Sequence, residues 1–210
     1  MEPLASDSSE TQRLLQEVRD GKPGGRDRLL DQHRAYLRRF VEVRLDPKLR
    51  VRVDPSDVVQ DTQMEAVRRL GRYLKQPPMP FRLWLRQLAY DRVLMLRRHH
   101  LRAARRAVER EVVLPDQSSL QLAGQVLASG PTPSQQLVQH ELVRRVRQAV
   151  AHLPEGDREV LIMRNLEGLS NREVAQLLGI DPSTASRRYG RAVIQLREIL
   201  LESDLAEPEA

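Results

Sequence analysis

The stretch SNREVAQLLGIDPSTASRRYGRAVIQL, residues 170–196, holds the signals of two short helices joined by a sharp turn. Ser170 and Glu173 have the spacing of a capping box, in which the serine caps the helix and the glutamate reaches back to its start. Gly179 stands where a left-handed cap ends a helix, and the Asp-Pro pair that follows is a typical start for the next one. A capped helix, a turn and a second helix in this order predict a helix-turn-helix.

The second of these helices has two different faces. Apolar residues recur every three or four positions along one face and are expected to pack against a core. The opposite face presents small, hydroxyl and arginine residues: Ser183, Ser186, Arg187, Gly190 and Arg191, with Arg188 beside them. Short hydroxyls and arginines suit a helix that enters the major groove of DNA. The alternative is an ordinary helical hairpin whose arginine face is solvated.

The rest of the C-terminal half divides into a linker, a domain and a tail. Residues 112–134 contain glycines, prolines, serines and glutamines without strong periodicity, which is typical of a flexible linker, although a short helix within it stays open. Residues 135–202 are expected to form the domain that carries the helix-turn-helix, and residues 203–210 a tail. No segment has the alternation of a strand.

Residues 21–111 are predicted to form a first helical domain. Apolar residues recur at helical spacing over about 26–45 and about 81–106, with a third helix between them. The loop Leu74–Pro80 separates the last two helices, because its prolines forbid regular structure. Residues 1–20 are expected to be a flexible N-terminus, with a frayed start that runs into a helix. The predicted fold class is therefore all-α, with two small helical domains joined by a flexible linker.

The composition excludes several classes of protein. The chain has 210 residues, a net charge of +6 and no cysteine, so a disulfide scaffold, a cysteine-ligated zinc site and a catalytic thiol are excluded. Aromatic residues make up 3%, which argues against a binder that stacks bases on rows of aromatic rings. No apolar stretch reaches transmembrane length and the polar start lacks a signal-peptide pattern, so a cytoplasmic protein without membrane insertion is expected.

Charge is distributed unevenly over the first domain. Residues 81–110 hold nine arginines against Asp91 and Glu109. The preceding helix instead carries a cluster of acidic residues: Asp54, Asp57, Asp61 and Glu65. A basic helix suits a phosphate backbone and an acidic one does not, so the two helices are expected to meet different partners. The alternative is a solvated surface of mixed charge.

Three segments, in order along the chain, resemble an extracytoplasmic-function sigma factor of bacterial RNA polymerase. DPSDVVQDTQMEAVRRL (54–70) resembles the family's D-x-V-Q-[DE]-x-F helix, and FRLWLRQLAYDRV (81–93) resembles its F-x-x-W-L-x-x-I-A-x-N stretch. Residues 153–196 resemble the family's fourth region almost without gaps. The resemblance implies a sigma region 2-like helical bundle over 21–111 and a region 4-like helix-turn-helix domain over 135–202.

The function that this resemblance implies is transcription initiation. Such a subunit binds core RNA polymerase and directs it to promoters through their minus-10 and minus-35 elements. The implied partners are core polymerase, through its β′ clamp helices and β flap, promoter DNA, and an anti-sigma factor. No catalytic residue, metal or cofactor is implied.

The resemblance also implies roles for individual residues. Docking on the polymerase clamp is implied for Asp57, Gln60 and Asp61. Binding of the minus-10 element is implied for Arg82, Trp84, Arg86, Asp91 and Arg92, with a plain core role as the alternative for Trp84. Binding of the minus-35 element is implied for Ser170, Ser183, Thr184, Ser186, Arg187, Arg188 and Arg191.

Three departures from the family pattern concern the minus-10 element. Asp91 replaces the usual asparagine, Gln63 replaces the usual phenylalanine, and the loop Leu74–Pro80 is rich in proline and slightly long. An ionised aspartate offers only acceptors, which favours a base that carries an amine. The alternative is that Asp91 pairs with Arg92 or another arginine and never meets DNA.

Two other functions stay open on the residues alone. A stand-alone helix-turn-helix regulator needs only the C-terminal domain, although the acidic DVVQD helix argues against it. A small helical metalloenzyme would use Asp54, Asp57 and Asp61 as ligands, but the sequence offers no inward-pointing Glu-x-x-His partner.

Overall fold

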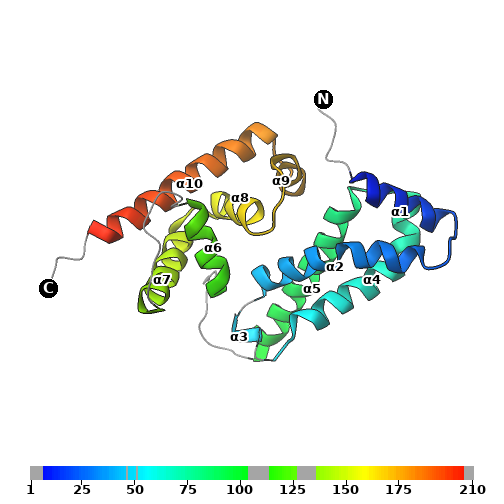
Figure 1. Cartoon of the computed structure of the whole chain (residues 1–210), viewed down its shortest axis with the longest axis horizontal. Helices are drawn as coiled ribbons and strands as arrows, with labels where there is room; N and C mark the ends of the chain where they lie inside the picture. Colours follow the sequence, from blue (N-terminus) through cyan, green and yellow to red (C-terminus); the bar gives the residue numbers. More distant parts are fainter. Residues whose placement is uncertain (1–6, 46, 51, 104–113, 127–135, 206–210) are drawn as a thin grey trace. The chain divides into compact units, whose positions relative to one another are not determined.

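The computed structural model of the chain describes residues 7–45, 47–50, 52–103, 114–126 and 136–205. These residues form helices and no strand, so the predicted all-α fold class is confirmed for them. The chain divides into two compact units, with the boundary after residue 106 (Figure 1). None of the described helices is long and apolar enough to cross a membrane.

The first unit is a bundle of helices in which α2 packs on α1, α4 and α5, and α4 packs on α5. Its elements are α1 (Ser9–Arg19), α2 (Gly25–Arg44), α3 (Pro47–Arg50), α4 (Pro55–Lys75) and α5 (Phe81–Ala103). The short α3 is not predicted by the sequence. α4 starts as expected, because the Asp54 side chain caps it and accepts a hydrogen bond from the Ser56 N–H at 2.7 Å.

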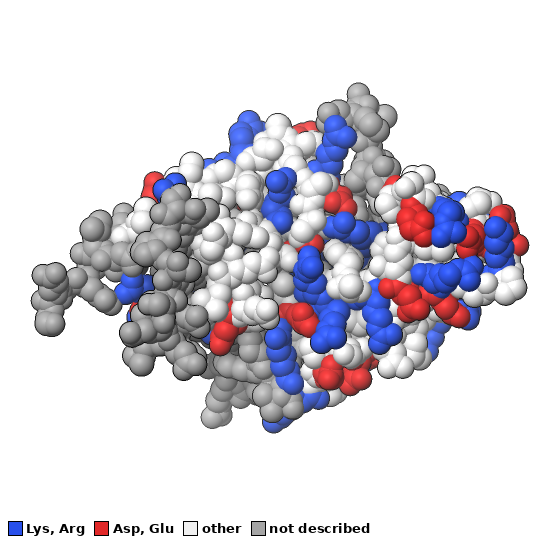
Figure 2. Space-filling view, in the orientation of Figure 1, with Lys and Arg blue, Asp and Glu red and all other residues white. Residues whose placement is uncertain are grey.

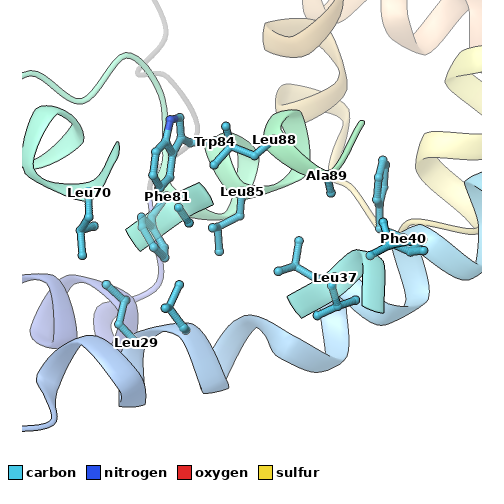
Figure 3. Close-up of a cluster of buried hydrophobic side chains, with 14 of the residues drawn as sticks. Leu29, Leu37, Phe40, Leu70, Phe81, Trp84, Leu85, Leu88 and Ala89 are labelled. Carbon is cyan, nitrogen blue, oxygen red and sulfur yellow. The ribbon is translucent and has the colours of Figure 1, made fainter. Parts of the chain in front are cut away.

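The core of the first unit gathers between α2 and the first half of α5 (Figure 3). Phe81, Leu85 and Ala89 lie on one stripe of α5, as the periodicity predicts, and all three are fully buried. Leu37 and Phe40 supply the facing side chains of α2 (Figure 3). Burial of each leucine or phenylalanine stabilises the fold by about 1.5–3 kcal/mol, so this stripe positions α5 firmly.

The start of α5 lies in an aromatic cluster. The Phe81 ring meets the rings of His33 and Tyr73 edge-on, each with centroids 5.3 Å apart. Trp84 packs on both Tyr73 and Phe81, at 4.6 and 5.5 Å between centroids. The cluster also secures the loop before α5, because the Tyr73 hydroxyl donates a hydrogen bond to the Met79 carbonyl at 3.0 Å. Since α4 continues through Lys75, this loop is Gln76–Pro80 and is shorter than expected.

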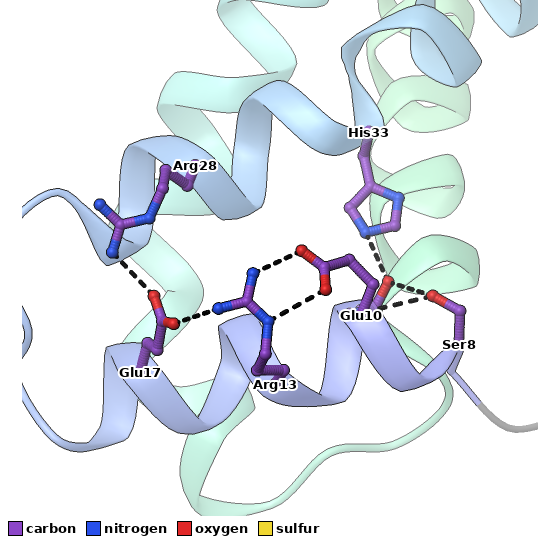
Figure 4. Close-up of polar contacts among 7 residues, drawn as sticks. Ser8, Glu10, Arg13, Glu17, Arg28 and His33 are labelled. Carbon is purple, nitrogen blue, oxygen red and sulfur yellow. Dashed lines mark hydrogen bonds and ion pairs between the residues drawn. The ribbon is translucent and has the colours of Figure 1, made fainter.

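Residues 9–19 of the expected flexible N-terminus form α1, the helix into which this segment was expected to run (Figure 4). Ser8 caps this helix and accepts a hydrogen bond from the Thr11 N–H at 3.2 Å. Leu14 and Leu15 are buried in the core that α1 shares with α2. Tertiary packing therefore stabilises a segment whose short apolar pattern is weak by itself. Residues 1–6 lie outside the described part of the chain.

His33 of α2 is a buried polar residue beneath α1. Its side chain is 6% exposed, and its Nε2 lies 3.3 Å from the Thr11 hydroxyl (Figure 4). Burial, together with the positive charge of Arg82, lowers the pKa of His33 from 6.5 to about 4. The imidazole is thus held neutral in the folded protein at neutral pH.

The second unit contains α6 (Asp116–Val126), α7 (Gln136–His152), α8 (Glu155–Asn165), α9 (Asn171–Leu178) and α10 (Pro182–Leu205). α10 packs on α7, α8 and α9, so the last helix organises this unit. Its buried side chains include Ala185, Ala192 and Leu196, at the spacing that the sequence predicts. The helix also continues through residues 203–205, which were expected to belong to the tail.

The expectation of a flexible linker over residues 112–134 is corrected for α6. This helix packs on α7 and buries Leu122 and Ala123. Arg147 of α7 secures its start, donating to the Leu114 carbonyl at 2.6 Å and pairing with Asp116 at 2.5 Å. α6 therefore belongs to the second unit. The linker residues 112–113 and 127–134 lie outside the described part of the chain.

We predict that acid destabilises the first unit through His33. A base whose folded pKa lies below its unfolded value stabilises the fold above the unfolded pKa, and this stability is lost as pH falls. With a pKa of about 4 in the fold and 6.5 unfolded, the loss between pH 7 and pH 5 is about 2 kcal/mol. Urea unfolding followed by the fluorescence of Trp84, the only tryptophan, measures this unit.

The control for this prediction is a histidine that is exposed. His33→Gln should flatten the pH dependence of the unfolding free energy between pH 5 and 7, whereas His152→Gln, on α7, should leave it unchanged. An unaltered pH profile in His33→Gln would contradict the assigned burial effect.

Candidate nucleic-acid and polymerase interfaces

The helix-turn-helix of the second unit has the local structure that the sequence predicts. Ser170 and Glu173 form the complete capping box, with the Ser170 N–H donating to Glu173 Oε2 at 2.7 Å. Gly179 adopts the left-handed conformation, with φ of 62°, and ends α9. Asn171 then links the two helices, since its side-chain amide donates to the Pro182 carbonyl at 2.8 Å. These contacts fix the angle at which α10 leaves the turn.

The predicted DNA face of α10 is open to solvent over most of its length. Ser183, Ser186, Arg187 and Arg191 are exposed, while Thr184 and Arg188 are partly buried. Arg187 donates a hydrogen bond to the Thr184 hydroxyl at 3.1 Å, which orients its guanidinium along the helix. Ser170 is exposed as well, but its hydroxyl already serves as the cap of α9.

Arg191 is bound to a carboxylate that sequence analysis missed. Asp157 of α8 is 4% exposed, and its two oxygens accept bonds from Arg191 Nε and Nη2 at 3.0 and 2.9 Å. This bidentate geometry is the strong form of the arginine–carboxylate pair. The bond to Asp157 raises the pKa of Arg191. Asp157 therefore joins α8 to the middle of α10, and Arg191 is a structural residue as well as a candidate phosphate contact.

Arg188 also packs toward α8. A methyl group placed on Gly156 would lie 2.9 Å from Arg188 Nη1, so the guanidinium lies over that glycine. The three arginines of the predicted face thus differ in their surroundings. Arg187 is the one whose side chain is exposed and makes no ion pair among the described residues.

The candidate docking face of the first unit lies on α4. Asp57 and Gln60 are exposed one turn apart, and Met64 continues the same face with 48% exposure. Asp61 differs from these residues, because its carboxylate pairs with Arg92 of α5. Asp61, expected to dock on polymerase, and Arg92, expected to bind the minus-10 element, are therefore bound to each other. Their ion pair joins α4 to α5.

The residues expected at the minus-10 element do not share one exposed face. Direct DNA contact of Trp84 and Arg86 stays a prediction, and both residues are buried here, at 9% and 4% exposure. Trp84 packs in the aromatic cluster, and the Arg86 guanidinium lies over the Phe40 ring at 5.1 Å. Both residues therefore have little surface open to solvent. Arg82 is partly buried with its guanidinium 4.5 Å from the centre of the Tyr36 ring.

Asp91 lies away from the loop Gln76–Pro80. It is ten residues from the start of α5, which is about 15 Å along the helix. There it is exposed and lines a groove of 280 Å³ between α4 and α5, together with Met64, Leu88 and Met95. Arg92 pairs with Asp61, and the expected contact of Asp91 with DNA stays a prediction.

The surface of the first unit carries acidic and basic side chains side by side. Figure 2 shows acidic and basic side chains interspersed on its visible face. Glu65 of α4, for example, bonds to Arg69 at 2.5 Å and to Arg68 at 3.2 Å, and these bonds lower the pKa of Glu65. Among the described residues, no three histidine or acidic side chains converge in a way that would hold a metal ion.

Comparison with known proteins identifies the family. Residues 143–196 match the family model of sigma-70, region 4. The chain is 33% identical over 147 residues to the RNA polymerase sigma factor CnrH of Cupriavidus metallidurans, covering 70% of this chain and 73% of that protein. It is 28% identical over 141 residues to the ECF RNA polymerase sigma-E factor of Haemophilus influenzae, covering 67% and 71%.

Two further matches extend over nearly the whole chain. The RNA polymerase sigma factor CarQ of Myxococcus xanthus is 26% identical over 191 residues, covering 91% of this chain and 98% of that protein. The structure of CnrH in complex with the cytosolic domain of CnrY has the same fold, with a TM-score of 0.56 and 24% identity over 92% of this chain and 98% of that one.

These matches define the class of the protein. The chain belongs to the extracytoplasmic-function family of RNA polymerase sigma factors. Its function is that of a sigma factor, and the alternative of a stand-alone helix-turn-helix regulator is not supported.

We predict that the charge of Asp157 stabilises the second unit through its bidentate pair with Arg191. Asp157→Asn keeps the shape and removes the charge-assisted bonds to Arg191, so the Tm should fall by on the order of 5 °C. Differential scanning calorimetry of the full chain measures this change. Glu155→Gln, an exposed change in the first turn of the same helix, is the control and should shift the Tm by less than half as much. Equal shifts for the two variants would refute the role of the buried pair.

Proposed function

We propose that this protein is the dissociable specificity subunit of bacterial RNA polymerase, a cytoplasmic binding protein and not an enzyme. Its second unit would bind the minus-35 element, and its first unit would bind polymerase and the minus-10 element. The observation that carries this proposal is the exposed hydroxyl and arginine face of α10 in a unit separate from the exposed Asp57–Gln60 face of α4. Run-off transcription with core polymerase and a promoter library tests it directly.

The proposed docking face is the α4 surface formed by Asp57, Gln60 and the outer side of Asp61. Its acidic and amide groups suit a basic surface on the β′ clamp helices, and half-exposed Met64 adds apolar area beside them. For the second unit, the resemblance implies a partner surface on the β flap.

The proposed minus-35 contacts divide by accessibility. Arg187, with Ser183 and Ser186 one turn apart on the same exposed side, is placed to meet base edges. Thr184 orients Arg187 through their hydrogen bond. Arg191 and the N-terminus of α9 at Ser170 would meet phosphates, since their polar groups already have partners that fix them. Arg188, whose guanidinium lies over Gly156, is assigned to phosphates with them.

The proposed minus-10 contacts begin at the loop Gln76–Pro80. The prolines of this loop restrict its backbone before DNA arrives, which lowers the cost of ordering it around an unstacked base. Arg82 lies one residue into α5 and is the nearest basic side chain on that helix. Asp91 and Arg92 lie too far along α5 to belong to the same base pocket, so any DNA they meet would lie further along the promoter.

A regulatory partner is also proposed. The solved structure of CnrH contains that protein in complex with the cytosolic domain of CnrY. By analogy, an anti-sigma factor would hold this chain inactive by covering the surfaces that polymerase needs.

We predict that Asp57→Arg abolishes polymerase docking. Reversing an exposed charge at the centre of the docking face should reduce co-purification with core polymerase by about tenfold or more, and the loss should be smaller at high salt. Circular dichroism should be unchanged, because Asp57 is exposed. The matched control is Asp31→Arg on α2, which makes the same charge change on another exposed helix. Equal retention of polymerase by both variants would exclude the α4 face.

We predict that Arg187→Ala relaxes specificity at a single minus-35 position. Loss of a base-reading arginine costs about 1–3 kcal/mol of discrimination at that position. Binding of the holoenzyme to promoters that vary at each minus-35 position measures it. Arg197→Ala, an exposed change two to three turns further along α10, should leave the profile intact. A uniform loss across all sequences in Arg187→Ala would make Arg187 a phosphate contact.

A further inference from the structure

The start of α5 lacks a cap from its own part of the chain. The residue before it is Pro80, whose side chain has no hydrogen-bond acceptor, and its first turn contains no acidic residue. The first N–H groups of any helix have no partner within the helix. In α5 these donors lie beside the buried Phe81 and Trp84 rings, so water is a poor substitute for a protein acceptor.

Asp7, 74 positions earlier in the chain, supplies the missing acceptor. Its Oδ1 and Oδ2 accept hydrogen bonds from the Phe81 N–H at 2.8 and 2.9 Å, and its Oδ1 lies 3.5 Å from the Arg82 N–H. The carboxylate thus caps the helix from a distant part of the chain, through the N–H groups of its first two residues, whereas an ordinary N-cap side chain bonds to the second or third. A charged acceptor is favoured there, because the N-terminus of a helix carries partial positive charge.

The segment before α1 holds Asp7 in place. The Asp7 carbonyl accepts a hydrogen bond from the Gln12 side chain at 3.0 Å, and the neighbouring Ser8 caps α1. The residue whose carboxylate caps α5 therefore stands directly before the residue that caps α1.

The same contact secures one end of the loop Gln76–Pro80. At Met79, the loop carbonyl is held by the Tyr73 hydroxyl of α4. Two residues later, the Phe81 N–H is held by Asp7. The backbone between these two bonds, which includes Pro80, therefore has little freedom. Removal of Asp7 would break the bond at Phe81 and leave the bond at Met79 in place.

We propose that Asp7 is a positioning residue for promoter recognition: its carboxylate caps α5 from a distance and fixes the loop Gln76–Pro80 in the shape that receives a minus-10 base. This inference rests on the proposed function of that loop. Asp7 itself need not touch DNA, since it acts through the Phe81 N–H. The segment ahead of α1 then sets promoter discrimination although it lies far from the loop in the sequence.

Two readouts test this inference on the full chain. Hydrogen exchange should show the Phe81 amide exchanging about fivefold faster in Asp7→Ala, the effect of losing a helix cap. Run-off transcription with core polymerase, on templates carrying each base at each minus-10 position, should show discrimination reduced by a similar factor at one or two positions. Asp7→Asn keeps an acceptor oxygen without the charge, so it should fall between wild type and Asp7→Ala.

Glu10 provides the matched control. It is exposed, lies in the same segment and pairs with Arg13 of its own helix, so Glu10→Ala and Glu10→Gln should leave both readouts as in wild type. If Asp7→Ala does not fold, the comparison of Asp7→Asn with Glu10→Gln decides. Asp7 variants with the wild-type base profile would overturn this inference alone. Wild-type holoenzyme that shows no preference among bases at minus-10 would overturn the proposed role of the loop and this inference with it.

Discussion

The burial of Phe81 at the first position of α5 is the constraint on which the rest of the first unit depends. The ring is fully buried between His33 of α2 and Tyr73 of α4. A helix that begins inside a core must also satisfy the donors at its start, and here Asp7 does so. Phe81 therefore connects α5 with α2, with α4 and with the segment before α1. Its ring packs on the first two, and its N–H bonds to the third.

This constraint explains how the loop proposed to receive a minus-10 base can have a defined shape although it is short and irregular. The prolines limit the conformations of the loop, and Tyr73 and Asp7 anchor it at its end. His33 belongs to the same cluster, held neutral by burial. A loop that is ordered before DNA arrives loses less entropy on binding, so the core of the unit and its proposed function use the same contacts.

Net charge alone is a poor guide to the DNA surface of this protein. Of the 35 basic residues, several in the regions of interest are bound within the fold: Arg86 lies over Phe40, Arg92 pairs with Asp61, and Arg191 pairs with Asp157. Arg187 is exposed on the recognition helix instead. Internal pairing therefore decides which arginines in these regions are available to a partner, and a count of basic residues does not.

The sequence by itself determined the helix-turn-helix, the family and most of the helices, although not α3 or the extent of α1 and α6. The capping box of α9, the glycine that ends it and the Asp54 cap of α4 are local signals, and local signals need only neighbours in the sequence to act. The spacing of apolar residues likewise indicated the buried stripes of α5 and α10. The exposed face of α10 followed from that spacing by subtraction.

Tertiary structure alone decided which polar residues are accessible. Nothing in the sequence distinguishes Arg86 from Arg187 in accessibility, yet Arg86 is buried and Arg187 is exposed. The sequence also shows nothing that would connect Asp7 with Phe81 or Asp157 with Arg191. The physical reason is that an ion pair or a cap between distant residues depends on how whole helices pack, and packing is a property of the folded unit and not of any window of sequence.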